Sequence, residues 1–203
     1  MRDWAPYLCR SISGHGPAEC HNIIYPLNYL IMISIKMQEA INAQINAEMW
    51  SAYLYLSMSM DAEAKGLKGI AIWFYVQWLE EQDHAHILMN YMNNQDAAVH
   101  LEPISAVPSV WKSVLDMFRD TLDHEQEVTS LIHDLVSVAM DEHDFATISR
   151  LQWFIDEQVE EEASARNIID RLKRTNDDPL SIDKLDHELS HRAYQPASPL
   201  AKV

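Results

Sequence analysis

Four long segments of the chain carry an apolar stripe at helical spacing, and polar side chains interrupt each stripe near its middle. In the clearest segment, residues spaced by 3 and 4 define one helical face: Ile70, Phe74, Gln77, Glu81, His84, Leu88 and Tyr91. The interruptions in the other segments are Glu48, Glu125 and the pair Gln158 and Glu161. A carboxylate on a buried face is unfavourable unless it is paired or binds a cation. The pattern therefore predicts four helices around one core that holds a multivalent cation.

The composition agrees with an all-α domain. Of 203 residues, 48% are hydrophobic and only 4 are glycine, so the chain can bury a substantial core but has few residues suited to tight turns. Its formal net charge of −16 disfavours binding to nucleic acid. No stretch is long enough to span a bilayer, so we expect no membrane partner. Cys9 and Cys20 form no disulfide framework, which favours a reduced, cytoplasmic setting.

The periodicity also predicts the order of the elements. We expect long helices at 34–62, 68–94, 110–140 and 144–174, and a short fifth helix at 181–191. A short turn joins the first long helix to the second, and another joins the third to the fourth. Each pair is therefore antiparallel. The link 95–109 contains Pro103 and Pro108 and is long enough to run the length of the bundle. The predicted fold is an all-α four-helix bundle with a long crossover between its second and third helices and a short C-terminal helix.

The two ends of the chain lack this pattern. Residues 1–31 show no helical periodicity, and we expect them to be an appended or mis-called upstream extension. A flexible N-terminal arm is the alternative. Residues 32–192 would then form one domain, followed by a flexible tail at 193–203.

Several separate motifs resemble those of the bacterial non-haem ferritins, in the ferritin-like di-iron family. They are Gln-Ile-Asn-Ala-Glu at 44–48, Ser-Ala-Tyr-Leu-Tyr-Leu-Ser at 51–57, Glu-Glu-Gln-Asp-His at 80–84, His-Glu-Gln at 124–126 and Glu-Gln-Val-Glu-Glu-Glu at 157–162. They fall in order at matching spacing within residues 32–190. The resemblance implies a ferritin-like bundle and a homo-oligomeric 24-subunit shell that stores ferric mineral.

The resemblance further implies a di-iron ferroxidase centre inside each subunit. The residues implied for the first iron are Glu48, Glu81 and His84. Those implied for the second are Glu81 as a bridge, Glu125 and Gln158, with Glu161 within reach. Independently, Glu81 and His84 lie at i and i+3, where they can chelate one ion. Carboxylates with one imidazole suit iron better than copper or a structural zinc.

Two further features follow from the resemblance. Tyr55 matches a tyrosine found beside such a centre, where packing alone is the other interpretation. Four acids match a third iron site of the bacterial members: Glu80, Glu157, Glu160 and Glu161. The acidic run could instead be a solvated helix surface.

We therefore expect a ferroxidase that oxidises Fe(II) with dioxygen or peroxide and stores the product. We expect no haem, because no methionine stands out as a haem ligand. Gln158 and Glu161 replace the second Glu-x-x-His of bacterioferritins, which argues against a permanent symmetric di-iron cofactor. The main alternative is a non-catalytic ferritin storage or scaffold subunit. The net charge disfavours a DNA-protecting mini-ferritin, and a rubrerythrin-type peroxidase would need a Cys-rich module that this sequence lacks.

Overall fold

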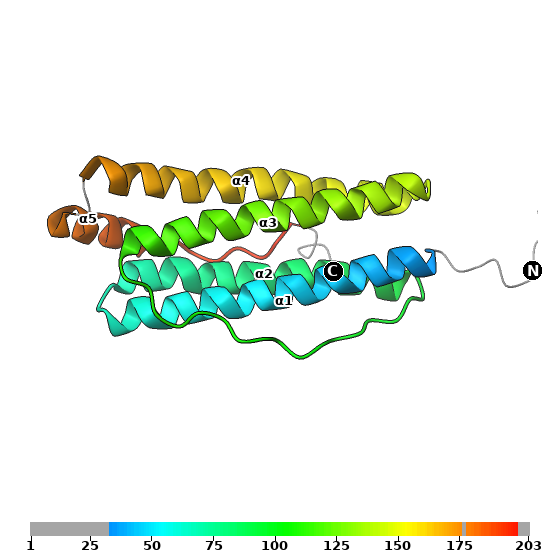
Figure 1. Ribbon diagram of the computed structural model, residues 1–203, viewed down its shortest axis with the longest axis horizontal. Coiled ribbons are helices and arrows are strands. Elements are labelled where there is room, and N and C mark those ends of the chain that lie inside the picture. The colour runs from blue at the N-terminus through cyan, green and yellow to red at the C-terminus, as the bar shows by residue number, and fades with distance from the viewer. Residues whose placement is uncertain (1–32, 176–177, 199–203) are drawn as a thin grey trace, which may run out of the picture. The chain divides into compact units, whose positions relative to one another are not determined.

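The computed structural model describes residues 33–175 and 178–198, which form five helices. They are α1 (Ile35–Ala64), α2 (Lys68–Asn94), α3 (Val114–Asp141), α4 (Phe145–Thr175) and α5 (Pro179–Leu189). The first four form the bundle, with a long link from α2 to α3, and α5 packs against one end (Figure 1). This confirms the expected all-α fold. The extension at 1–31 and the tail beyond residue 198 lie outside the described residues.

Local side chains set the ends of α1. Ser34 Oγ accepts a hydrogen bond from the backbone N–H of Met37 at 3.0 Å, which satisfies one of the free donors in the first turn. The helix is followed by Gly66, whose φ of +79° lies in the left-handed region that favours glycine. α1 and α2 therefore turn tightly and lie side by side as the sequence predicted.

The third helix begins at Val114, four residues after the start near 110 that the periodicity suggested. Ser113 caps it by accepting a hydrogen bond from the N–H of Asp116 at 3.1 Å. The backbone just before it makes a tertiary hydrogen bond instead of a helical one, because the N–H of Trp111 donates to Asp61 Oδ2 of α1 at 3.1 Å. The cap and this tertiary contact decide the boundary.

Two asparagines on α1 hold the crossover between α2 and α3. Asn42 accepts from the N–H of His100 at 2.7 Å and donates to the carbonyl of Ala98 at 3.0 Å. Asn46, one turn later, accepts from the N–H of Glu102 at 2.8 Å and donates to the carbonyl of His100 at 2.9 Å. The two amides satisfy backbone groups of an extended segment that has no strand beside it. They explain why the crossover runs along α1 (Figure 1).

The apolar core consists of two clusters. The α5-side cluster contains, among others, Tyr55, Phe74, Phe118, Ile168 and Leu185. The far cluster contains, among others, Ile41, Ile45, Leu88, Val128 and Phe154. Each long helix contributes to both clusters, so the middle of each helix lies between them. In the described part of the chain, no helix is both long and apolar enough to cross a membrane.

The short helix α5 is docked on the first turn of α2. Asp186 Oδ1 accepts from the N–H of Ile70 at 2.8 Å and so caps α2 from a distant point in the sequence. Gly69 permits this contact, because a Cβ there would lie 1.6 Å from the carbonyl oxygen of Asp186. After α5 the chain returns along α2, where Tyr194 Oη and the N–H of Ala197 donate to Asp83 Oδ2 at 2.8 and 2.9 Å.

Candidate metal centre

Buried polar side chains from all four long helices lie between the two apolar clusters. Each is at most 8% exposed: Gln44 and Glu48 from α1, Gln77, Glu81 and His84 from α2, Glu125 from α3, and Gln158 and Glu161 from α4. On α3, for example, Phe118 belongs to the α5-side cluster and Val128 to the far cluster, with Glu125 between them. The helices that build the core therefore also gather these groups at one level of the bundle.

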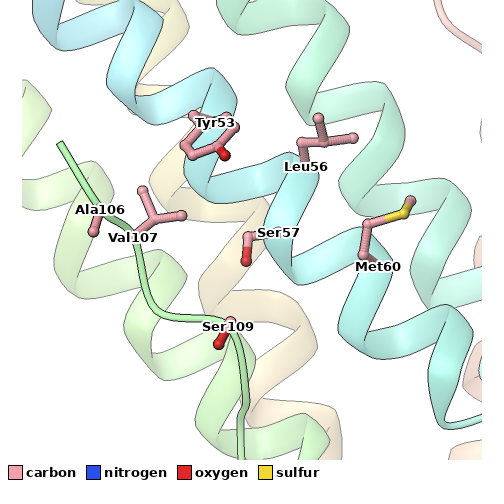
Figure 2. Close-up of a pocket in the computed structure, with 7 residues that line it drawn as sticks. All are labelled: Tyr53, Leu56, Ser57, Met60, Ala106, Val107 and Ser109. Atoms are coloured by element: carbon pink, nitrogen blue, oxygen red, sulfur yellow. The ribbon is translucent and has the colours of Figure 1, made fainter. Parts of the chain in front are cut away.

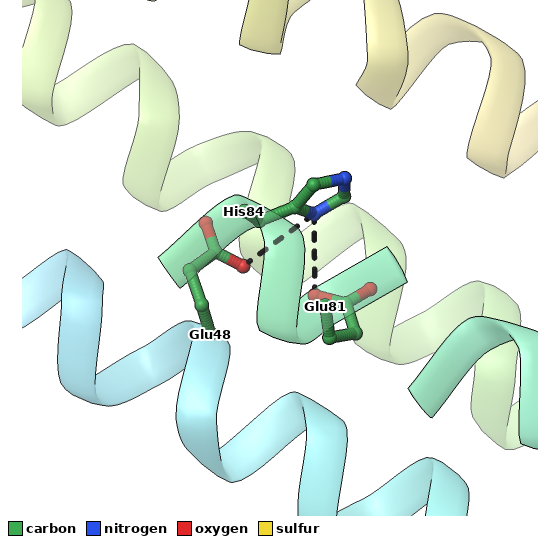
Figure 3. A group of neighbouring side chains, drawn as sticks. All are labelled: Glu48, Glu81 and His84. Carbon is green, nitrogen blue, oxygen red and sulfur yellow. Dashed lines mark ion pairs between the residues drawn. The ribbon is translucent and has the colours of Figure 1, made fainter. Parts of the chain in front are cut away.

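Glu48, Glu81 and His84 form the tightest part of this level (Figure 3). His84 Nδ1 lies 3.4 Å from Glu81 Oε2 and 3.9 Å from Glu48 Oε2. One potential ligand atom from each of the three lies within 4.8 Å of the others. Among the described residues this is the one group of at least three His, Cys, Asp or Glu side chains that meets this geometry.

The carboxylates of this group retain unsatisfied oxygens. Glu48 Oε2 and Glu81 Oε2 are buried and have no hydrogen-bond partner, although Glu48 Oε1 accepts from Gln44 Nε2 at 2.9 Å. Buried carboxylate oxygens without donors are costly, and a hard cation coordinated by them would relieve that cost. The donor set of two carboxylates and one imidazole fits ferrous iron.

Glu125 is held on the other side by hydrogen bonds. Tyr55 Oη donates to Glu125 Oε1. Gln158 Nε2 donates to Glu125 Oε2 and to its backbone carbonyl, both at 3.1 Å. Glu161 Oε2 accepts a separate bond from Gln77 Nε2 at 2.9 Å. The structure thus links Tyr55, Glu125 and Gln158 directly and orients Glu161 from α2.

Burial and mutual repulsion make these acids hard to ionise. Burial and then the nearby Glu81 raise the pKa of Glu48 from 4.5 to about 8. Burial and then Glu161 raise the pKa of Glu125 to about 8. The pKa of Glu81 also rises, because it is buried and faces Glu125 and Glu161. A multivalent cation would reverse this effect, since its charge favours the ionised carboxylates around it.

The four acids suggested for a third iron are less closely associated. Glu160 is exposed, whereas Glu80 and Glu157 are half-buried. Glu80 Oε2 pairs with Arg192 at 2.5 Å. These four acids are not a group with ligand atoms within 4.8 Å of one another, within the part of the chain described here. The third site stays a prediction.

Three side chains that contact the centre were not assigned a role from the sequence. Gln44 and Gln77 each lie one helical turn before a candidate ligand, on the same face, and that position was a usable signal. Arg192 follows α5 in a segment without periodicity, and only the tertiary structure reveals it.

A pocket of about 340 Å³ lies between α1 and the crossover (Figure 2). Tyr53, Ser57 and Met60 line it from α1, and Val107 and Ser109 from the crossover. Its lining includes none of the candidate ligands, and Tyr53 and Met60 are 48% and 53% exposed. The pocket is therefore a feature of the subunit surface.

The chain is similar to a known domain family and to several known proteins over most of its length. Residues 38–175 match the family model of the ferritin-like domain. The bacterial non-heme ferritin of Bacteroides fragilis is 42% identical over 161 residues, which cover 79% of this chain and 100% of that protein. The Staphylococcus aureus protein is 37% identical over 80% of this chain and 98% of its own length. An open pore ferritin from Archaeoglobus fulgidus superposes with a TM-score of 0.78 at 47% identity, over 79% of this chain and 99% of that one.

Proposed function

Because the chain belongs to the ferritin family of iron-storage proteins, we propose that it oxidises Fe(II) with dioxygen at an intra-subunit di-iron centre. The ferric product would be stored as mineral inside a shell of identical subunits. Iron is both the substrate and the cargo in this proposal. Peroxide is an alternative oxidant for the same chemistry.

The observation that carries the proposal is the group Glu48, Glu81 and His84. It combines three potential ligand atoms within 4.8 Å with two buried carboxylate oxygens that lack hydrogen-bond donors. Stable cores rarely leave such atoms unsatisfied, and the exceptions need a physical reason. Coordination of the first Fe(II) provides one.

A second Fe(II) would bind between Glu81 and the α3–α4 side of the centre. Its ligands would be Glu81 as the bridge, Glu125 and Gln158, with Glu161 in reach. Each Fe(II) gives up one electron, and one dioxygen takes up two electrons and two protons to become hydrogen peroxide. The neutral Gln158 amide supplies less charge than a carboxylate, so the second site should hold ferric product more weakly and release it for storage.

The neighbouring residues would position these ligands. Tyr55 donates to one oxygen of Glu125 and Gln158 to the other, so Glu125 is oriented before metal binds. Gln44 fixes the first-site carboxylate of Glu48 in the same way. The rings of Trp153 and Phe154 lie 5.4 and 5.9 Å from the His84 ring and restrict its rotation.

Assembly into a shell is supported by apolar side chains on the surface of the subunit. Tyr53 and Met60 on α1, Ile72 and Tyr75 on α2, and Ile104 on the crossover are all between 38% and 53% exposed. Exposed apolar groups of this size commonly become buried at interfaces. We propose a 24-subunit shell in the cytoplasm.

The test is aerobic addition of Fe(II) to the purified full-length protein. Oxidation is followed by absorbance, and retained iron is measured after gel filtration. We expect a fast phase equal to two Fe(II) per subunit, with the iron eluting together with the protein. Iron retention without fast oxidation would instead identify a non-catalytic storage subunit. Oxidation no faster than in a Glu81→Ala variant would contradict the proposed centre.

A further inference from the structure

Arg192 reaches the metal centre from the segment that follows α5. Its guanidinium lies over the Trp73 ring, 4.7 Å from the centroid, and donates to the Trp73 carbonyl at 3.2 Å. The aromatic face and the carbonyl are both on α2 and fix the plane of the guanidinium. The side chain is only 25% exposed, so this arginine is partly enclosed.

The same guanidinium contacts two residues beside the candidate ligands. One nitrogen donates both to Gln77 Oε1 and, at 2.5 Å, to Glu80 Oε2. Gln77 in turn donates from Nε2 to Glu161 Oε2 at 2.9 Å. Because Arg192 offers only donors, it requires the oxygen of the Gln77 amide to face it. The amide nitrogen must then face Glu161.

The docking of α5 determines where Arg192 lies. Asp186 caps α2 at Ile70, and Gly69 allows the two backbones to approach closely. Beyond Arg192, Tyr194 is anchored to Asp83 on α2. The guanidinium is therefore held between two attachment points on the same helix.

We propose that Arg192 limits each subunit to the inner pair of iron ions by serving as the counter-cation of Glu80 and, through Gln77, the positioning residue of Glu161. This inference rests on the proposed di-iron function. Any further cation in the acidic run must displace the guanidinium from Glu80, and Glu161 can turn outward only if it leaves Gln77. Arg192 thus opposes occupation of the predicted third site and favours a fixed Glu161 at the centre.

Charge and geometry both support this role. Two cations that share one carboxylate repel each other, and partial burial weakens solvent screening of that repulsion. Lysine could supply the charge, but it lacks the second planar nitrogen that donates to the Trp73 carbonyl while the first contacts Gln77 and Glu80.

The test counts Fe(II) bound per subunit by anaerobic titration calorimetry of the full-length assembled protein. We expect the parent to bind two ions per subunit. Arg192→Gln should bind a third ion about tenfold more tightly than the parent does, or more, because the competing charge is gone. Arg192→Lys should show a smaller gain. Adding Glu80→Gln to Arg192→Gln should remove the gain, since the released carboxylate is then absent.

Arg171→Gln is the matched control. Arg171 forms a two-pronged ion pair with Glu188 that joins α4 to α5, at 2.7 and 2.8 Å. Its loss removes an α4–α5 contact but leaves the Arg192 segment attached to α2 through Asp186 and Tyr194, so the ion count should not change. If Arg192→Gln fails to assemble, the affinity of Arg192→Lys for a third ion is the deciding measurement. A tighter third site supports the inference, and an unchanged one overturns it.

Three results would overturn the inference. They are an unchanged ion count and affinity in both Arg192 variants, the same gain in Arg171→Gln, and a parent that already binds three ions. None of these three results overturns the proposed function. A parent that binds fewer than two ions would overturn the proposed function, and the inference with it.

Discussion

The α5-side cluster and the candidate metal centre are equally buried, but burial has opposite effects on their stability. Phe118 and Glu125 lie two turns apart on α3 and are 0% and 1% exposed. Removing the Phe118 ring from water stabilises the fold by roughly 2–3 kcal/mol. Burying Glu125 opposes folding, as its raised pKa of about 8 shows. The apolar clusters therefore supply the stability that offsets the unfavourable burial of these acids, which lie where a cation could bind.

The largest effect should come from removing Glu81, the proposed bridge between the two irons. Glu81→Ala should slow Fe(II) oxidation by about a thousandfold or more, because metal chemistry depends on this ligand. The metal-free subunit should keep or gain stability, since one of several repelling acids is gone. Stopped-flow absorbance and thermal unfolding measure the two quantities. Glu39→Ala, an exposed acid on α1, is the control and should change neither. Fast oxidation in Glu81→Ala would remove Glu81 from the centre.

The apolar cluster should respond in the opposite way. Phe118→Ala should lower the free energy of unfolding by about 3–5 kcal/mol, because it leaves a cavity against Phe74 and Trp73. Metal bound per folded subunit should not change. Denaturant unfolding with parallel iron analysis checks both expectations, and Phe145→Ala, which removes a 74% exposed ring, is the control. Loss of metal binding in folded Phe118→Ala would show that metal binding depends on the packing of the α5-side cluster, contrary to this comparison.

The pH dependence of the metal-free protein sharpens the same comparison. Glu48 and Glu125 have pKa values of about 8 in the folded protein, against 4.5 ordinarily. Between these values the unfolded chain has lost protons that the folded protein keeps, so stability falls as pH rises from about 4.5 to about 8. At about 1.4 kcal/mol per pKa unit, a shift of this size corresponds to roughly 5 kcal/mol for one acid, so the loss should be on the order of several kcal/mol.

Chemical denaturation at pH 5, 6, 7 and 8 in a chelator measures this slope. Glu48→Gln should flatten it, because the amide has no proton to lose in this range. Phe118→Ala should shift the whole curve without changing its slope. A slope that is identical in the parent and Glu48→Gln would show that Glu48 is not the source.

Tyr55→Phe should have the smallest effect. Loss of the hydroxyl leaves one oxygen of Glu125 without its donor, while Gln158 still holds the other. Oxidation should slow by about tenfold, the effect of losing one group that orients a ligand. Thermal stability should change little, since Tyr55 also packs in the α5-side cluster and the ring remains. An unchanged rate would mean that Tyr55 serves only in packing.

The sequence predicted the helices well, because an apolar stripe is a local property of the chain. The start of α3 was misplaced because Ser113 and the contact between Trp111 and Asp61 decide it, and the second of these is a long-range contact. Glu81 and His84 were found together because residues three positions apart on one helix share a face.

The parts of the site that were missed depend on distant contacts. Gln77 and Glu161 are 84 residues apart, and Arg192 and Glu80 are 112 apart. No periodic pattern connects such positions, so only the packing of α4 and α5 against α2 reveals them. The crossover was foreseen from its length and prolines, whereas its attachment through Asn42 and Asn46 was not.

The central claim is that the polar level of the bundle holds two irons bridged by Glu81. The most direct test is an anomalous difference map at the iron absorption edge, from crystals loaded anaerobically with Fe(II). The account predicts two peaks per subunit, about 3.5–4 Å apart. One should lie among Glu48, Glu81 and His84, and the other between Glu81 and Glu125. A single peak, or two peaks that do not share Glu81, would contradict it.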